Sequence, residues 1–321
     1  MAKITGRPKA ICFSDITAPT HLYQGLENEA SESLFRHDEL VAAEQSRSLW
    51  LHFLNTSRDL SRSMGAMDRK SIACIGRGIS PSYFHHRVLL CRISDRIAAQ
   101  LYSGTLEDSW ATPQRKIREL QRELSSWADN LPEDLAIHNQ VPMKTDPRVK
   151  VELSMYYYSI QMILYRPCLC EVIFENESSQ SREFNRESAR ACVYAAISLL
   201  GVMADNPSAH AAYQLLPFWT LLHYVAPAAT VLLLELCLDH QHFTDEHIDP
   251  LPNIRKAMAY LWCMTEDSLS AFHAWRIFRL LLSEISCKYE DLSFADIPEE
   301  APQPIGWTIE SELSFSRALV S

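Results

Sequence analysis

The residues most suited to chemistry in this chain are polar side chains that follow a long apolar segment. Six potential metal ligands lie close together there: Asp239, His240, His242, Asp245, Glu246 and His247. Neutral imidazoles and carboxylates can together bind a divalent metal. Their spacing lacks the fixed helical pattern of known zinc-enzyme motifs, and the stretch is typical of a loop or a frayed helix end. We therefore interpret these side chains as solvent-facing and predict no metal site.

The cysteines do not form a zinc site either. The chain has 9 of them, an odd number at irregular spacing, and the one close pair, Cys168 and Cys170, is separated by a single residue. A structural zinc site needs paired cysteines that are about two to four residues apart. We therefore predict no zinc finger and no cofactor. The cysteine pattern, and the lack of an apolar stretch after Met1, indicate an intracellular protein.

Motifs for nucleophilic catalysis and phosphate binding are also missing. No serine lies in a Gly-x-Ser-x-Gly turn, and Gly76-Arg77-Gly78 lacks both the following glycine and the flanking strand of a dinucleotide-binding loop. His85 and His86 are interpreted as the polar start of a helix. We predict no catalytic residues, so the protein is not expected to be an enzyme.

Composition favours a folded, helical protein that does not bind nucleic acid by itself. The chain has 321 residues, of which 47% are hydrophobic, and only 8 are glycine, which is few for the many turns of a β-protein. Its formal net charge is -10. Because nucleic-acid affinity depends on lysine and arginine displacing counterions, this charge opposes direct binding to DNA.

One apolar segment requires a choice between a membrane and a protein core. Residues 206–234 contain no charged side chain, and 215–234 is long enough to cross a bilayer. The same stretch contains Pro217, Pro227 and His223 and has no flanking basic cluster. We therefore predict buried helices, broken near the prolines, and no membrane span.

Apolar residues recur at helical spacing along most of the chain. The segments that predict helices are 39–54, 83–101, 112–131, 149–165, 184–203 and 253–288, the last as one long helix or two joined by a kink. Thr112-Pro113 is typical of a helix start, while Pro132 and Pro167 are expected to end the helices before them. The segment 149–165 is apolar all round and should be central. No segment alternates as a strand does, so the prediction is an all-α helical bundle without a sheet.

Three groups of residues have the order and spacing of a known domain. They are Gly6-Arg7-Pro8 with Ala10-Ile11, then Leu120, Leu124, Trp127 and Leu131-Pro132, then Leu153, Tyr156 and Leu164-Tyr165-Arg166-Pro167. Together they resemble the middle homology region of fungal binuclear-zinc-cluster transcription factors, over roughly residues 4–285. The resemblance implies an all-α regulatory domain of a nuclear transcription regulator that acts as a dimer.

The chain departs from that family in two ways. The family's six-cysteine cluster, basic linker and short coiled coil are missing, and the Gly6-Arg7-Pro8 element lies much nearer the start than usual. We therefore expect a regulatory domain over 1–289 that is shortened at its front, as a truncated gene, a degenerate paralogue or a natural partner subunit. Apolar faces left uncovered would require a partner, either a second copy or an intact zinc-cluster factor.

Residues 290–321 differ in character from the rest. Acidic residues there alternate with hydrophobic ones such as Trp307, Leu313 and Phe315, which is typical of an activation segment that binds a coactivator. An ordinary tail that packs Trp307 onto the bundle is the other interpretation. For Arg166 we expect a contact with the last carbonyls of its helix or with a neighbouring carboxylate. The alternative to a transcription regulator is a helical metabolite sensor or adaptor protein.

Overall fold

A computed structural model describes residues 81–102, 110–137, 147–169, 178–209, 212–213, 216–238, 241–243, 248–288 and 294–304. The Gly6-Arg7-Pro8 motif and the predicted helix 39–54 lie outside these residues, as does the end of the C-terminal tail from 305 onward.

The described part of the chain is all-α, as the sequence predicts, and contains no β-strand. Its helices are α5 (Pro81–Leu101), α6 (Ala111–Asp129), α7 (Pro147–Leu169), α8 (Ser179–Gly201), α10 (Phe218–Cys237), the short 3-10 helix η3 (Gln241–Phe243), α11 (Leu251–Met264) and α12 (Leu269–Lys288).

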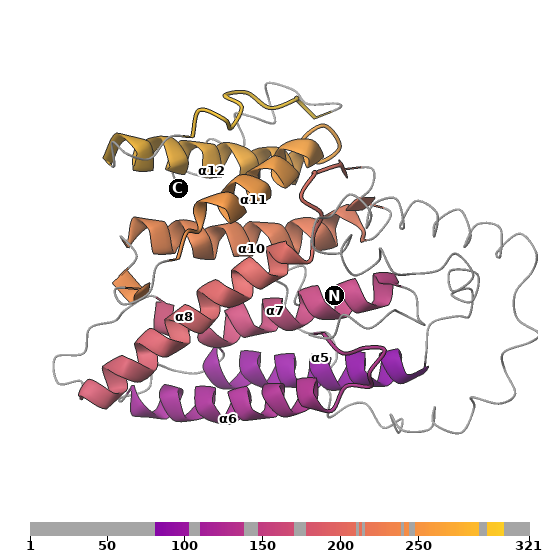
Figure 1. Ribbon diagram of the computed structural model, residues 1–321, viewed down its shortest axis with the longest axis vertical. Coiled ribbons are helices and arrows are strands. Elements are labelled where there is room, and N and C mark those ends of the chain that lie inside the picture. Colours follow the sequence, from indigo (N-terminus) through magenta and orange to yellow (C-terminus); the bar gives the residue numbers. More distant parts are fainter. Residues whose placement is uncertain are drawn as a thin grey trace, which may run out of the picture.

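The helices are stacked along the long axis of the molecule, with α6 outermost at one end and α12 at the other (Figure 1). The pair α5 and α6 lies at one end, α7 and α8 cross in the middle, and α10, α11 and α12 form the other end. Because each helix contacts mainly its neighbours in sequence, the fold is built from successive helix pairs that share one core.

The core is centred on α7, which contacts α5, α6, α8 and α10. Its apolar residues face every side, and Leu153, Ile160 and Leu164 are completely buried. The prediction that this helix is central is therefore confirmed. On α8 the buried residues include Ala189 and Ala196, whose small side chains let α7 and α8 approach closely.

The end of α7 differs from the prediction. Pro167 was expected to end the helix, yet α7 continues to Leu169 with Pro167 inside it. A proline lacks the amide that would donate to the carbonyl four residues earlier, here that of Ile163. The hydroxyl of Tyr102 donates to that carbonyl instead, at 2.6 Å. A side chain from the end of α5 thus compensates for the missing bond.

The break predicted at Pro227 is also absent. Pro217 precedes α10 as its N-cap residue, but the helix then continues through Pro227 to Cys237. Pro227 lies on the exposed side of α10, so its ring does not disturb the packing of the buried side. The predicted break near Pro217 is therefore present, after helical residues at 209 and 212–213, whereas the predicted break at Pro227 is absent.

Two other boundaries are set by specific hydrogen bonds, one local and one between helices. The segment 253–288 forms separate helices, and α12 begins after Ser268, whose hydroxyl accepts a hydrogen bond from the amide of Ala271 at 3.2 Å. At the other boundary, α6 begins at Ala111 and not after a Thr112 cap. The indole of Trp110 donates to Asn185 of α8 at 3.0 Å, which anchors the start of α6.

Candidate interaction and ligand sites

Trp127 joins three helices at one end of the molecule. Its side chain is 6% exposed, its indole donates to the carbonyl of His86 in α5 at 3.0 Å, and its ring stacks on Tyr157 of α7 with centroids 5.7 Å apart. Leu131 packs against the core beside it, and the carbonyl of Pro132 accepts from the amide of Leu135 at 2.9 Å in the turn that follows. These motif residues join helices to one another.

Arg166 makes a contact that differs from both expectations. Its side chain is exposed, and its guanidinium lies 5.3 Å from the ring centre of Tyr102, so it stacks on the aromatic ring that compensates for Pro167. The neighbouring Tyr165 is buried, and burial raises the pKa of its phenol. Tyr165, Arg166 and Pro167 therefore form one structural unit at the end of α7.

A half-buried polar cluster between α5 and α7 was not found from the sequence. The carboxylate of Glu152 accepts from the guanidinium of Arg87 at 2.9 Å and from the hydroxyl of Tyr83 at 2.7 Å. The same guanidinium lies 3.7 Å from the ring centre of Tyr156. Burial raises the pKa of Tyr156 to about 12, so this phenol stays neutral near pH 7. Because the Glu152 oxygens and the Arg87 group are engaged with each other, the cluster is suited to joining helices.

His242 was interpreted as a solvent-facing residue, and this interpretation is wrong. The side chain is 2% exposed, and its Nδ1 lies 2.6 Å from Oε2 of Glu235, which is completely buried in α10. The other Glu235 oxygen accepts from the His242 amide at 3.3 Å. On α8, Arg190 donates to the His242 carbonyl at 2.5 Å. This arrangement fixes η3 to α10 and α8.

The other potential metal ligands of that stretch lie outside the described residues: Asp239, His240, Asp245, Glu246 and His247. The second ring nitrogen of His242, Nε2, is buried without a hydrogen-bond partner. Within the part of the chain that the structure describes, no three histidine, cysteine, aspartate or glutamate side chains gather as a metal site would require.

The first part of the C-terminal tail packs against the helices. Phe294 and Ile297 are buried, the indole of Trp262 in α11 donates to the carbonyl of Glu300 at 3.0 Å, and Arg279 of α12 donates to that of Pro298 at 3.3 Å. Residues 294–304 therefore pack against the helices, while Trp307, on which the packing interpretation depends, lies outside the described residues.

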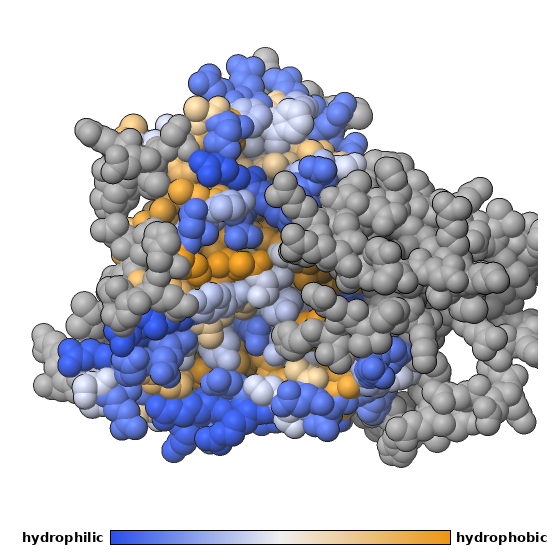
Figure 2. Space-filling view, in the orientation of Figure 1, coloured by the Kyte–Doolittle hydropathy of each residue, from blue (hydrophilic) through white to orange (hydrophobic). Residues whose placement is uncertain are grey.

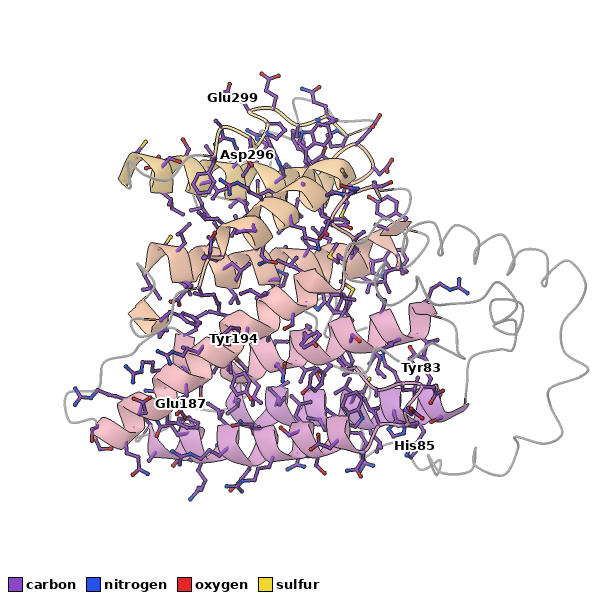
Figure 3. All side chains as sticks on the ribbon, viewed as in Figure 1. Tyr83, His85, Glu187, Tyr194, Asp296 and Glu299 are labelled. Carbon is purple, nitrogen blue, oxygen red and sulfur yellow. The ribbon has the colours of Figure 1, made fainter. Side chains whose placement is uncertain are left out.

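An open pocket of about 370 Å³ lies between this segment, α11 and the loop after α8. Its charged groups form two ion pairs, Arg255 with Asp296 at 2.8 Å and Lys256 with Asp205 at 3.1 Å. Its apolar lining residues are Pro207, Pro252, Met258, Ala259, Ile297 and Pro298. The volume is within the usual range for a small ligand, roughly 300–1,000 Å³. In Figure 3, Asp296 lies at the opposite end of the molecule from Tyr83 of the polar cluster.

The helix α10 has the length and composition of a membrane span, over Trp219–Cys237. Of this apolar stretch, 56% is buried inside the protein. Glu235, which belongs to the same helix, pairs with the buried His242. The predicted packing of this segment in the core is therefore seen on one side of the helix. Its other side is exposed, and Figure 2 shows apolar surface gathered across the middle of the molecule, at the level of α10.

Comparison with known proteins gives one informative similarity. The chain is similar to the transcription regulator galc of Aspergillus niger, with 27% identity over 264 residues that cover 69% of this chain. The chain spans about a third of that relative, since the match covers 32% of its length. No protein-family model matches the chain. No solved structure matches it either.

Proposed function

We propose that this chain is a transcription regulator of the fungal zinc-cluster type, which acts in the nucleus through contacts with other proteins. The observation that carries the proposal is the similarity to a fungal transcription regulator over 69% of the chain. The all-α fold agrees with the regulatory domain that the sequence motifs resemble.

Protein contacts are favoured over direct DNA binding on physical grounds. The net charge of -10 opposes attraction to phosphate, and the printed sequence contains no six-cysteine cluster. DNA would then be reached through a partner, either a second copy carrying further segments or an intact zinc-cluster protein. The acidic and hydrophobic residues beyond 304 would contact a coactivator.

The direct test is to tether the full chain to an unrelated DNA-binding domain and to measure a reporter gene in a fungal cell. We expect a several-fold change in reporter output relative to the DNA-binding domain alone. A matched variant with Trp307→Ala and Phe315→Ala should lose most of an activating effect, because coactivator binding depends on such hydrophobic residues. Unchanged reporter output, together with a cytosolic fluorescent fusion, would overturn the proposal.

A second candidate function is a metabolite sensor or adaptor protein without a transcriptional role. The observation that favours it is the pocket of about 370 Å³ beside α11. Native mass spectrometry of the purified chain would test it, because a small molecule held in the pocket would add mass. The substitution Ala259→Trp should remove that mass while leaving the helical signal unchanged, because Ala259 lines the pocket and is only half-buried.

A further inference from the structure

The pocket of about 370 Å³ beside α11 is formed by three separate parts of the chain. They are the loop after α8, the helix α11 itself and the segment 294–304, which we call the C-terminal strap. The strap contributes Asp296, Ile297 and Pro298 to the pocket. A molecule in the pocket therefore contacts the strap and α11 at the same time.

The charged groups around the pocket differ in exposure according to their sign. Each cation is partly buried and is held by an oxygen of the protein: Arg255 by Asp296, Lys256 by Asp205 and the Met203 carbonyl, and Arg279 by the Pro298 carbonyl. The carboxylates of the same region are exposed: Asp205, Asp296, Glu299 and Glu300. Figure 3 shows Asp296 and Glu299 at the same end of the molecule. The surface that an approaching molecule meets there is therefore mainly acidic.

The two carboxylates that line the pocket can accept further donors. The side chain of Asp296 is 55% exposed, against 37% for Arg255, and that of Asp205 is 47% exposed, against 12% for Lys256. In the polar cluster between α5 and α7, by contrast, Glu152 is only 19% exposed and already has two partners. Because a carboxylate can accept about four hydrogen bonds, the pocket's carboxylates are suited to binding a cationic group.

The rest of the pocket lining is apolar and restricts the class of cation. It consists of Pro207, Pro252, Met258, Ala259, Ile297 and Pro298. This lining favours a ligand with a hydrocarbon body over a bare metal ion, because burial of apolar surface stabilises the complex. None of the residues that the structure places around the pocket is aromatic. The pocket therefore lacks the ring faces that bind quaternary ammonium groups, and a cation with N–H donors fits it better.

We infer that this pocket binds a primary amine with an apolar body. The ammonium group donates to the carboxylates of Asp205 and Asp296, and the body packs against the prolines and Met258. The net charge of -10 attracts such a cation towards the protein. Because Ile297 and Pro298 contact the body, the bound amine holds the C-terminal strap against α11. This inference rests on the second candidate function, in which the pocket senses a metabolite.

The test is isothermal titration calorimetry of the full chain with 2-phenylethylamine and with hexylamine. The uncharged 2-phenylethanol and the anionic phenylacetate serve as comparison ligands. We expect both amines to bind, and both comparison ligands to bind at least about tenfold more weakly, because they lack the cation. The substitution Asp296→Asn should weaken amine binding about tenfold. Arg255→Gln should strengthen it, because Asp296 then loses its cation within the protein.

Two control variants show where the amine binds. Ala259→Trp fills the pocket and should abolish amine binding while the helical signal stays unchanged. Glu187→Gln removes an exposed carboxylate of α8 far from Asp296 (Figure 3) and should leave the affinity unchanged. Hydrogen exchange of the strap amides should slow when either amine is bound.

Absence of binding by both amines would overturn the inference, and so would amine binding that survives Ala259→Trp or is unaffected by Asp296→Asn. Binding of phenylacetate that is lost in Arg255→Gln would assign the pocket to an anion. The sensor candidate would then stand while the inference of an amine fails. None of these measurements involves DNA or transcription, so the reporter experiment tests the first proposal independently.

Discussion

A fully buried carboxylate is stable only when its surroundings satisfy both oxygens, and Glu235 illustrates this requirement. One oxygen lies against the ring of His242 and the other accepts from the amide of the same residue. Arg190 holds the adjacent carbonyl from α8. Three elements therefore depend on one acidic side chain inside a helix that is otherwise almost entirely apolar.

At the scale of single residues, we predict that Glu235→Ala strongly destabilises the folded protein. The change leaves the His242 ring and amide buried without an acceptor, and removal of one member of a buried pair costs on the order of 3–5 kcal/mol. Urea unfolding followed by circular dichroism measures the effect. Glu187→Ala is the matched control on α8, where the side chain is exposed, and it should change stability by less than about 0.5 kcal/mol. Equal effects of the two substitutions would contradict the prediction.

At the scale of elements, the end of α7 depends on another helix. Pro167 removes one amide from α7, and Tyr102 at the end of α5 supplies the donor that the Ile163 carbonyl would otherwise lack. Arg166 stacks on the same tyrosine ring. The length of α7 is therefore decided jointly by two helices.

We predict that Tyr102→Phe lowers the free energy of unfolding by about 1 kcal/mol, because the Ile163 carbonyl loses its donor. Combining it with Pro167→Ala should recover most of that loss, because alanine restores the amide within the helix. A double-mutant cycle from chemical denaturation measures the coupling between the two positions. Independent, additive effects would show that the tyrosine hydroxyl does not compensate for the proline.

At the scale of the whole molecule, the core contains several buried tyrosines. Burial is the main cause that raises the pKa of Tyr156 and of Tyr157 to about 12, from a value of 10.0 in solution. The folded protein therefore holds these protons more tightly than the unfolded chain does. The resulting stability is fully present below pH 10 and is lost as the pH rises from 10 towards 12.

We predict an alkaline unfolding transition between pH 10 and 12, to which each phenol contributes roughly 3 kcal/mol. Absorbance of phenolate should increase cooperatively as the helical circular dichroism signal falls. Tyr157→Phe should move the midpoint to higher pH, since one titrating group is removed. Buried phenols that titrate near pH 10 with unchanged helical signal would disagree with this account.

The sequence alone determined the helical class, most helix positions and the central place of α7. These features follow from the spacing of apolar residues along the chain. This spacing is a local property and does not depend on how the neighbouring helices pack. The motif residues Trp127 and Tyr165 were likewise expected on helices, and both are buried there. The expectation that the chain does not bind DNA directly rests on its net charge and composition alone.

Only the tertiary structure decided which polar residues are buried and where helices end. His242 follows a helix in a polar stretch, and no local pattern distinguishes it from exposed neighbours until Glu235 is placed beside it. The continuation of α7 through Pro167 depends on Tyr102, far away in the sequence. The exposed side of α10 lacks aspartate, glutamate, lysine and arginine, as most of its buried side does. Which side faces water depends on how the neighbouring helices pack, because long-range contacts, and not local spacing, set the position of each face.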